Sequence, residues 1–376
     1  MNKLLVFAEY YYPGYKAGGP IQSLLNITEC IREDFTISVY TSSYDLTAAA
    51  PYDQVTPNEW NNIVVRGNEY SIFYKAGRGL QIRSLIRAVR KTDVIYLNGI
   101  FSSSFFLLPV LVNFFLKKKM IISPRGMLQA GALNVKSKKK RIYLFLLKKS
   151  GLLNNAKWHA TDPVEKEDIA SVFAKNNGIV VLPNLPRKPL PVIATPQKEA
   201  GKLNLVYLSL ITAKKNLDLL LAAVAEMDNV YLNVYGPVKD VKYWEKKCLP
   251  IISRHPDKIT YKGDLQPEMV QQTIAAYDAL ALLSSGENFG HALYECLSVG
   301  RPVITSPFTP WTDLEIKKAG FNTEINNVST VIATLERMRL MDQTTYKLFC
   351  IQAHHEACEY YFGTDFKAGY KKLFTS

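Results

Sequence analysis

The sequence is poor in cysteine and lacks recognisable metal-binding motifs. Its five cysteines are odd in number, and none belongs to a Cys-x-x-Cys pair or a Cys/His ligand spacing. We therefore expect small, buried thiols in a reducing compartment instead of a disulfide framework or a zinc site. No Asp-x-Asp motif occurs either. We expect neither a metal nor a cofactor.

Long hydrophobic runs and a secretion signal are also missing. The apolar stretch 105–116 is too short to span a bilayer and is interrupted by Pro109 and Asn113. It suits a buried helix or a segment that dips into an interface. At the amino terminus, Met1-Asn2-Lys3 leads directly into a strand-like run without a small-residue cleavage site. These features predict a cytoplasmic protein.

Acidic residues are absent between Val94 and Thr161, where twelve Lys and Arg nearly equal the whole formal net charge of +13. Nucleic acid, phospholipid headgroups and diphosphate substrates are the anionic partners that such a region suits. No known nucleic-acid motif accompanies the charge, so we expect no nucleic-acid partner. Cations flank the apolar segment 142–147 on both sides, as in surface-bound amphipathic helices.

We therefore expect residues 117–149 to contact the cytoplasmic face of the inner membrane, making the protein peripheral. The alternative is a helix packed on its own domain with a solvated basic end. We favour membrane contact, because the cations lie on both sides of the apolar segment.

A chain of 376 residues, 48% of them apolar, is long enough for two α/β cores. Short runs rich in Val, Ile and Tyr alternate with helical patterns in both halves, which predicts two parallel sheets. The proline-rich segment 183–191 continues neither a helix nor a central strand, and therefore divides the chain. The predicted strands are 4–8, 36–40, 94–97, 120–123, 157–160 and 180–182, then 203–209, 230–235, 258–262, 279–283 and 302–305.

The stretch 284–304 follows a predicted strand and opens a predicted helix. Its glycine-containing loop presents backbone N–H groups at a helix N-terminus, which suits a phosphate or a polyhydroxylated ligand. Glu287 lies in this loop, and Glu295 lies within the helix, where its carboxylate could accept hydrogen bonds from a ribose diol. A capping Glu and a solvated helix Glu are the alternative interpretation.

Glu287 and Glu295 enclose Asn288-Phe289-Gly290 and are followed by Gly300-Arg301-Pro302-Val303-Ile304 and Thr309-Pro310-Trp311. This pattern resembles the Glu-seven-residues-Glu signature of retaining GT-B glycosyltransferases, specifically glycosyltransferase family 4, or glycosyl transferases group 1. The resemblance implies an α/β GT-B fold, in which two Rossmann-like domains with parallel sheets face an interdomain cleft. It implies that Glu287 contacts donor-sugar hydroxyls and Glu295 the nucleotide ribose, within a donor-binding set that includes Asn288, Phe289 and Gly290.

The segment 207–220 is similar to the strand–loop–helix in which this family clamps the donor diphosphate with an arginine and a lysine. Lys215 matches the lysine, whereas Leu210 stands where the arginine is expected. The lost positive charge weakens stabilisation of the leaving diphosphate unless Lys214 or another residue compensates. Otherwise both lysines are solvated side chains at a helix start, a place where the dipole disfavours cations.

In the amino-terminal half, Gly18 and Gly19 fall on the family's glycine pair that approaches the donor phosphates and the acceptor. Paired glycines permit a close backbone approach to an anion. Arg125 stands where many relatives carry a histidine near the reacting sugar; arginine is no base at neutral pH but can hold phosphate. We predict catalytic roles for Glu287, Lys215 and Arg125. His159 is either a core histidine or a site residue.

The resemblance covers nearly the full chain. It implies an acceptor-side domain at 1–185, a linker at 186–199 and a nucleotide-sugar domain at 200–356, with a final helix 357–376 that packs back on the first domain. Its apolar stripe includes 360–362 and 366–374.

The function that the resemblance implies is that of a metal-independent, retaining, hexosyltransferase-type enzyme. It would move a sugar from a UDP- or GDP-linked donor to a lipid-linked or growing bacterial surface polysaccharide, such as an O-antigen or capsule. The alternatives are a nucleotide-sugar epimerase or a glycosyl phosphorylase of the same fold, or an inactive protein that binds nucleotide-sugar or membrane lipid. A phosphorylase needs a pyridoxal-bearing lysine that the sequence does not reveal. No Gly-x-Gly-x-x-Gly follows a strand, which disfavours an oxidoreductase.

Overall fold

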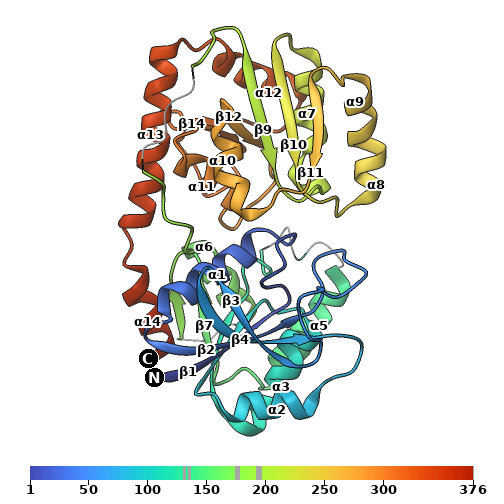
Figure 1. The fold of residues 1–376 in the computed structure, drawn as a ribbon, viewed down its shortest axis with the longest axis vertical. Helices are drawn as coiled ribbons and strands as arrows, with labels where there is room; N and C mark the ends of the chain where they lie inside the picture. Colours follow the sequence, from blue (N-terminus) through green and yellow to red (C-terminus); the bar gives the residue numbers. More distant parts are fainter. Residues whose placement is uncertain (130–132, 134–136, 174–177, 192–196, 376) are drawn as a thin grey trace. The chain divides into compact units, whose positions relative to one another are not determined.

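The computed structural model describes residues 1–129, 133, 137–173, 178–191 and 197–375. The chain forms two compact units (Figure 1): unit 1 comprises Met1–Leu185 and Asp365–Ser376, and unit 2 comprises Pro186–Thr364. Each unit contains one sheet of mostly parallel strands with helices between them. The predicted α/β class with two parallel sheets is confirmed.

The sheet of unit 1 has eight strands in the order β3-β4-β2-β1-β5-β6-β7-β8. The strands are β1 Asn2–Ala8, β2 Phe35–Ser42, β3 Trp60–Val65, β4 Asn68–Lys75, β5 Val94–Asn98, β6 Lys119–Ser123, β7 Lys157–Ala160 and β8 Ile179–Val181. β3 runs antiparallel to β4, and the other described pairs are parallel. The chain leaves β1 towards β2 and β4, then returns to β5 on the other side of β1. The strand order therefore reverses between β1 and β5.

Helices cover this sheet because its central strands are apolar on both faces: residues 4–8 of β1 are all buried. The helices are α1 Gly19–Ile31, α2 Ile82–Arg90, the π-helical η1 Ser103–Leu107 with α3 Leu108–Leu116, α5 Ser137–Lys149, α6 Pro163–Phe173 and α14 Phe366–Thr375. α14 packs beside α1. The ring of Phe374 in α14 lies 5.2 Å from that of Tyr96 in β5, so the chain end belongs to the core of unit 1.

Unit 2 has a six-stranded parallel sheet in the order β11-β10-β9-β12-β13-β14. Its strands are β9 Leu203–Leu208, β10 Val230–Tyr235, β11 Ile259–Gly263, β12 Ala279–Leu282, β13 Val303–Thr305 and β14 Gly320–Asn322. Its helical segments are η2 Ala213–Lys215, α7 Leu217–Glu226, α8 Val241–Tyr243, η3 Trp244–Cys248, α9 Leu249–Arg254, η4 Pro267–Met269, α10 Val270–Ala275, α11 His291–Ser298, α12 Val328–Arg339 and α13 Gln343–Phe362. Here the strand order reverses between β9 and β12.

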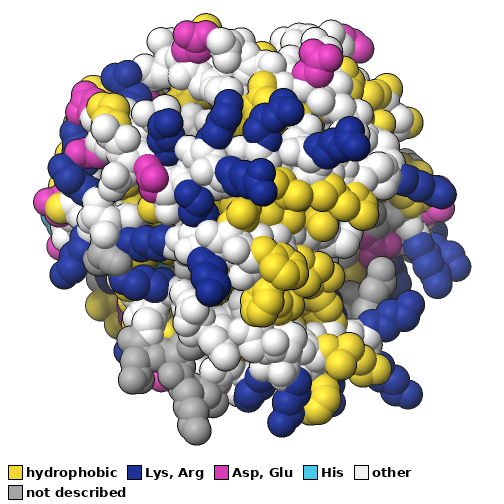
Figure 2. All heavy atoms as spheres, turned by 90° about the horizontal axis from the view of Figure 1, so that it is seen from below, with side chains coloured by type: hydrophobic (Ala, Val, Ile, Leu, Met, Phe, Trp, Pro, Cys, Tyr) yellow, Lys and Arg dark blue, Asp and Glu magenta, His cyan; other side chains and the backbone are white. Residues whose placement is uncertain are grey.

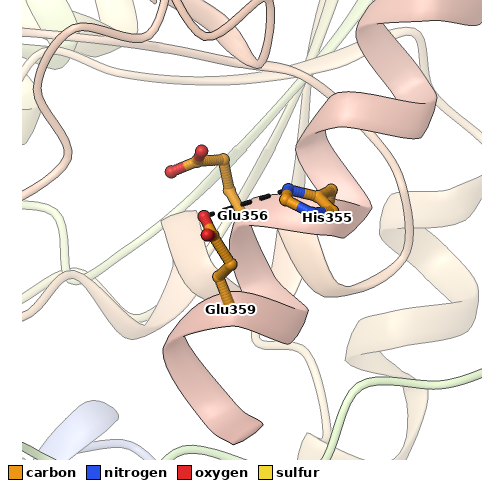
Figure 3. A group of neighbouring side chains, drawn as sticks. All are labelled: His355, Glu356 and Glu359. Carbon is orange, nitrogen blue, oxygen red and sulfur yellow. Dashed lines mark ion pairs between the residues drawn. The ribbon is translucent and has the colours of Figure 1, made fainter. Parts of the chain in front are cut away.

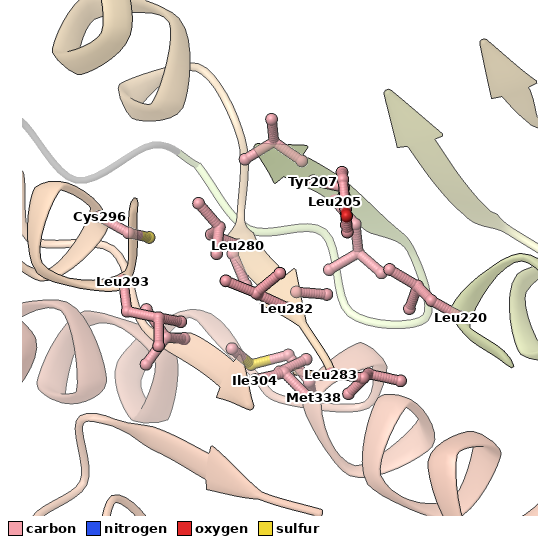
Figure 4. Close-up of a cluster of buried hydrophobic side chains, with 14 of the residues drawn as sticks. Leu205, Tyr207, Leu220, Leu280, Leu282, Leu283, Leu293, Cys296, Ile304 and Met338 are labelled. Carbon is pink, nitrogen blue, oxygen red and sulfur yellow. The ribbon is translucent and has the colours of Figure 1, made fainter. Parts of the chain in front are cut away.

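The core of unit 2 is formed by strand residues that meet helix residues (Figure 4). Leu205 of β9, Leu280 of β12 and Ile304 of β13 lie among Leu220 of α7 and Leu293 of α11, and all five are buried. The strands β9 and β12 thereby hold their following loops on a rigid base. These loops carry the candidate site.

The final predicted helix, 357–376, is two helices in the structure. α13 ends at Phe362 and its last turn packs on unit 2, where the ring of Tyr360 lies 5.2 Å from that of Phe289. Gly363 follows, and α14 then packs on unit 1 through Tyr370, whose hydroxyl donates to the Pro183 carbonyl at 3.0 Å. Only the part from Asp365 onward therefore packs on the first unit.

The predicted membrane segment 117–149 needs correction near its start. It contains β6, a strand between β5 and β7 whose residues 120–123 are buried, so this part cannot face a membrane. Residues 130–132 and 134–136 of the same segment lie outside the described residues, as do 192–196 of the predicted linker 186–199. None of the helices in the described part of the chain is long and apolar enough to cross a membrane.

Candidate functional site

The loops that follow β9 and β12 lie together at the point where the strand order of unit 2 reverses. Ligands in open parallel sheets bind at the carboxyl ends of the strands at such a point. The Ser285 N–H donates to the Lys214 carbonyl at 2.9 Å. The Asn216 amide donates to the Leu283 carbonyl at 2.7 Å and to the Ser285 hydroxyl at 2.9 Å. These bonds fix the two loops to one another.

An ion pair between Lys215 and Glu287 crosses the same two loops. Their side chains are only 16% and 13% exposed, so water screens the pair less than it screens a surface ion pair. The backbone N–H of Glu287 donates to the Phe308 carbonyl at 3.2 Å, which holds the loop against the segment after β13. The structure thus brings together two residues that the sequence nominated separately.

Lys214 adds a second cation at this place. Its side chain is exposed, yet desolvation by surrounding protein atoms lowers its pKa; the charge of Lys215 lowers it further, and that of Glu287 raises it. A Cβ on Gly286 would stand 3.5 Å from the Lys214 Nζ, an ordinary contact distance, so the ammonium group lies directly beside the loop after β12. Leu210 is half-buried and contributes no charge. Two cations beside one carboxylate form a site that suits an anion.

The loop after β12 ends at the N-terminus of α11. Gly290 precedes this helix with φ 78°, a left-handed conformation in which side chains are disfavoured. The Phe289 carbonyl accepts from the Trp311 Nε1 at 2.7 Å, and their ring centroids are 5.6 Å apart. This packing holds the backbone between Glu287 and the helix in one conformation.

Glu295 lies in the second turn of α11, and its side chain is buried. Burial raises the pKa of the neighbouring Tyr294 phenol, and the charge of Glu295 raises it further. Glu295 therefore lies on the buried face of α11, the helix that Gly290 precedes. Its role as a ribose ligand stays a prediction, as do the contacts of Asn288 and Phe289 with a donor.

In unit 1, the Arg125 guanidinium binds three side chains at the carboxyl end of the sheet. Nε donates to Asn98 Oδ1 at 2.8 Å, Nη1 to Asn184 Oδ1 at 2.5 Å and Nη2 to the Tyr96 hydroxyl at 2.9 Å. Arg125, which follows β6, therefore joins β5 to the segment that follows β8. Its predicted contact with phosphate stays a prediction.

His159 is a core histidine, the first of the two alternatives. It is fully buried in β7, and its Nε2 lies 2.8 Å from the Leu182 carbonyl, so this nitrogen must carry the proton. Nδ1 then accepts from the Tyr96 hydroxyl at 2.8 Å. Burial, followed by the charge of Arg125, lowers the pKa of His159 to about 3. The ring is neutral at physiological pH and supports Tyr96 beneath Arg125.

The glycine pair of unit 1 lies at the start of α1. Gly18 has φ 71°, and a Cβ there would meet nothing within 4 Å, so the backbone conformation alone favours glycine. Gly19 begins the helix. The Asp45 carboxylate accepts from the N–H groups of Tyr15 at 3.0 Å and Lys16 at 3.3 Å, which fixes the preceding loop. The predicted approach of this loop to an anion is untested.

Sequence reasoning missed the polar residues that hold these loops. Asn216 and Asn184 are single amides without a distinctive spacing, and their importance follows only from the carbonyl and side-chain groups that tertiary structure brings to them. The sequence offered one weak signal for Asn216: asparagine at the start of a predicted helix tolerates a left-handed conformation, and in the structure Asn216 has φ 48° directly before α7.

Among the residues that the structure describes, three potential metal ligands come together on α13: His355, Glu356 and Glu359 (Figure 3). His355 Nδ1 lies 3.9 Å from Glu359 Oε2, and Glu356 Oε2 lies 2.7 Å from the Lys317 Nζ. Lys317 already supplies a counter-charge. We assign the group to surface ion pairing.

Comparison with known proteins places these features in a wider context. Residues 192–344, within unit 2, match the family model described as glycosyl transferases group 1. No curated protein sequence matches the chain. HepE of Anabaena, solved with UDP and glucose, has a TM-score of 0.73 and 15% identity over 99% of this chain and 98% of that one.

Two further solved structures are similar to this chain over nearly its full length. Sucrose-phosphate synthase from Thermosynechococcus elongatus has a TM-score of 0.74 and 14% identity, covering 99% of this chain and 97% of its own. A variant of S. aureus TarM was solved with fondaparinux, α-GlcNAc-glycerol and UDP. It has a TM-score of 0.68 and 12% identity, and the match covers 100% of both chains. Similarity at this level shows a shared fold. The chain has the GT-B glycosyltransferase fold.

Proposed function

We propose that the chain is a glycosyltransferase that moves a sugar from a UDP- or GDP-linked donor to a hydroxyl of a lipid-linked or growing bacterial surface polysaccharide. The observation that carries this proposal is the Lys215–Glu287 pair at the switch point of unit 2, with Lys214 beside it. The family match over 192–344 and the UDP-bound structures of the same fold support it.

In this proposal the donor diphosphate lies against the ammonium groups of Lys214 and Lys215, near the N-terminus of α11. Glu287 accepts hydrogen bonds from the sugar hydroxyls, and Glu295 from the ribose. Because Lys215 already neutralises part of Glu287, the diphosphate competes with this carboxylate for the lysine. Donor binding therefore rearranges the ion pair and frees the carboxylate for the sugar.

The proposed reaction retains the anomeric configuration and uses no metal. The bond between the anomeric carbon and the β-phosphate oxygen breaks, and its electron pair stays on the phosphate. The acceptor oxygen forms the new glycosidic bond on the same face of the sugar, and its proton passes to the leaving phosphate oxygen. The lysines and the α11 N-terminus stabilise the charge that develops on the nucleoside diphosphate.

Leu210 favours a second candidate, an inactive protein that binds nucleotide-sugars. It leaves the loop after β9 with the charge of Lys214 and Lys215 alone, which suits binding more readily than turnover. The two candidates share one site and differ only in whether nucleoside diphosphate is released. A nucleotide-sugar epimerase would instead return an epimerised nucleotide-sugar, with no net release of nucleoside diphosphate.

The test is release of free nucleoside diphosphate from UDP-, GDP- and ADP-sugars, with a panel of oligosaccharide and lipid-linked acceptors. Wild type, Glu287→Ala and Lys215→Ala are compared with Lys317→Ala, which removes a more exposed ion pair of unit 2. We expect release by wild type and Lys317→Ala, with losses of about 100-fold or more in the other two. Equal release by all four proteins contradicts the site.

Three further readouts address the remaining parts of the proposal. Donor binding without release by wild type favours the inactive binding protein. Proton NMR of the product reports retention or inversion. Activity that persists in excess EDTA agrees with a metal-free reaction, whereas loss that is restored by Mg²⁺ contradicts it.

A further inference from the structure

Helix α5 is apolar on two opposite faces. Its inner face packs on unit 1 through buried Leu144 and Leu147, and the Tyr143 hydroxyl donates to the Ile100 carbonyl at 2.9 Å. These contacts agree with the alternative stated above, that this segment is a helix packed on its own domain. They leave the second apolar face without a role in that packing.

The outer face of α5 exposes a stripe of large apolar side chains. Ile142, Phe145 and Leu146 are spaced as neighbours on one side of a helix and are 61%, 60% and 60% exposed. Exposed cations flank the stripe: Lys138, Lys139, Arg141, Lys148 and Lys149. A solvated helix face does not need such a concentration of apolar surface.

Helix α3 repeats this arrangement. Leu111, Phe114 and Phe115 have the same spacing, and Phe115 is 79% exposed, whereas the adjacent Val110 is fully buried. The exposed Lys117 follows directly. Two helices of one unit therefore each present an apolar stripe beside lysine.

Helix α2 packs against α3 and adds both kinds of side chain. Leu80 and Ile82, at its start, are exposed, and Arg83, Arg87 and Arg90 form an exposed stripe along it. Figure 2 shows the side of unit 1 on which α2 and α3 lie: hydrophobic side chains gather there among Lys and Arg, with acidic side chains towards the margin.

The part of the sequence that contains α2, α3 and α5 has few acidic residues. From Tyr70 to Thr161 the sequence contains a single acidic residue, Asp93. Its carboxylate accepts from the Lys3 backbone N–H at 2.8 Å. The apolar stripes are therefore surrounded by positive charge that the segment itself does not neutralise. Such a surface complements a partner that is both apolar and anionic over a wide area.

We propose that this surface, formed by the outer faces of α2, α3 and α5, docks the protein on a bilayer that contains anionic phospholipids. The Phe, Leu and Ile side chains enter the interface between headgroups and acyl chains, and the Lys and Arg side chains remain at the headgroup phosphates. An acidic protein partner does not need apolar stripes on separate helices. A second copy of this chain would place two basic rims against each other. The proposal does not depend on the glycosyltransferase assignment, because binding to vesicles needs no donor.

The test is co-sedimentation of the full chain with vesicles of phosphatidylcholine alone or with about 30 mol% phosphatidylglycerol. Lys148→Gln/Lys149→Gln is compared with Lys246→Gln/Lys247→Gln, an exposed lysine pair of unit 2 with the same charge change. We expect the first pair to weaken partitioning about 30-fold, and the second to leave it nearly unchanged. Raised salt weakens binding of the wild type.

The apolar contribution is tested separately. Phe115→Ser/Phe145→Ser is compared with Ile316→Ser/Leu340→Ser, which changes exposed apolar residues of unit 2. We expect at least a tenfold loss, about the effect of burying one such side chain, for the first pair only. Circular dichroism melting verifies that each variant is folded.

Three results overturn the proposal. One is a wild type that does not sediment with the anionic vesicles. Another is an equal loss of binding in the matched unit 2 variants. The third is a concentration-dependent dimer that Phe115→Ser/Phe145→Ser abolishes while vesicle binding is absent, because the surface is then an interface between copies.

Discussion

Lys215 and Glu287 are 72 positions apart in the sequence, yet their side chains form an ion pair across the loops after β9 and β12. If both act on the donor, removing either one disables the same step. We expect Lys215→Ala and Glu287→Gln each to lower nucleoside diphosphate release by about 100-fold or more. The double variant should lose little beyond the worse single variant, because residues that act as a unit are not additive.

Single-turnover release of nucleoside diphosphate measures all three proteins, and thermal melting checks that each is folded. Losses that multiply in the double variant would show that the two residues act independently, contrary to the site described above.

The lowered pKa of Lys214 predicts a pH dependence of nucleotide binding. Its ammonium group loses its proton at a lower pH than the ordinary 10.5, mainly because of desolvation. Only the protonated form attracts a diphosphate, so affinity for UDP should fall as the pH rises towards 10.5, and the fall should begin at a lower pH than an ordinary lysine would give. Isothermal titration calorimetry measures the affinity.

Lys214→Arg is the matched control, because a guanidinium keeps its charge over this range. Its affinity for UDP should stay nearly constant while that of the wild type falls. Parallel curves for the two proteins would assign the pH dependence to another group.

The parts of the fold that the sequence predicted are those with strong local signals. The buried runs of β1, β5, β9 and β12 are continuous and apolar, as parallel strands covered on both faces must be. β3 and β4 escaped prediction, because β3 lies at the sheet edge and includes Asn61 and Asn62. Its pairing with β4 depends on the Arg66-Gly67 turn, both of whose residues have positive φ. The break at Gly363 was missed because aromatic residues continue on both sides of it.

The candidate site was predictable as a set of residues but not as an arrangement. Glu287 and Lys215 could be nominated from the resemblance of their segments to known motifs, whereas their ion pair depends on the crossover that places β12 beside β9. Arg125 shows the converse. An arginine at this position indicated a ligand for phosphate. In the structure, three acceptors from distant segments already bind its guanidinium, and no local sequence pattern reveals them.

Gly290 and Gly67 provide a matched test of the α11 N-terminus, since both have φ 78°. A Cβ on Gly67 would meet nothing within 4 Å, whereas one on Gly290 would stand 2.9 Å from Leu293 Cδ1. We expect Gly67→Ala to cost about 1 kcal/mol of unfolding free energy through backbone strain, and Gly290→Ala about 2–3 kcal/mol through strain plus overpacking. Urea denaturation measures both. Equal costs would mean that the Leu293 side chain moves aside freely.

The buried His159 makes the stability of the protein depend on pH. In the folded chain its pKa is about 3, below the ordinary value of 6.5, whereas in the unfolded chain it titrates normally. Below about pH 6.5 the unfolded state therefore binds a proton that the folded state does not. The contribution of His159 to the unfolding free energy is fully present above pH 6.5 and is lost as the pH falls towards 3. The loss between pH 7.5 and 5.5 is about 1.4 kcal/mol.

His159→Gln should remove this loss, because a glutamine amide can still donate to the Leu182 carbonyl and accept from the Tyr96 hydroxyl, but does not titrate. Urea denaturation at both pH values gives the unfolding free energies of wild type and variant. His355→Gln serves as the control: His355 is exposed, so its substitution should leave the pH dependence parallel to that of the wild type. The same loss in His159→Gln as in the wild type would show that the acid sensitivity originates elsewhere, and that burial of His159 does not hold its ring neutral.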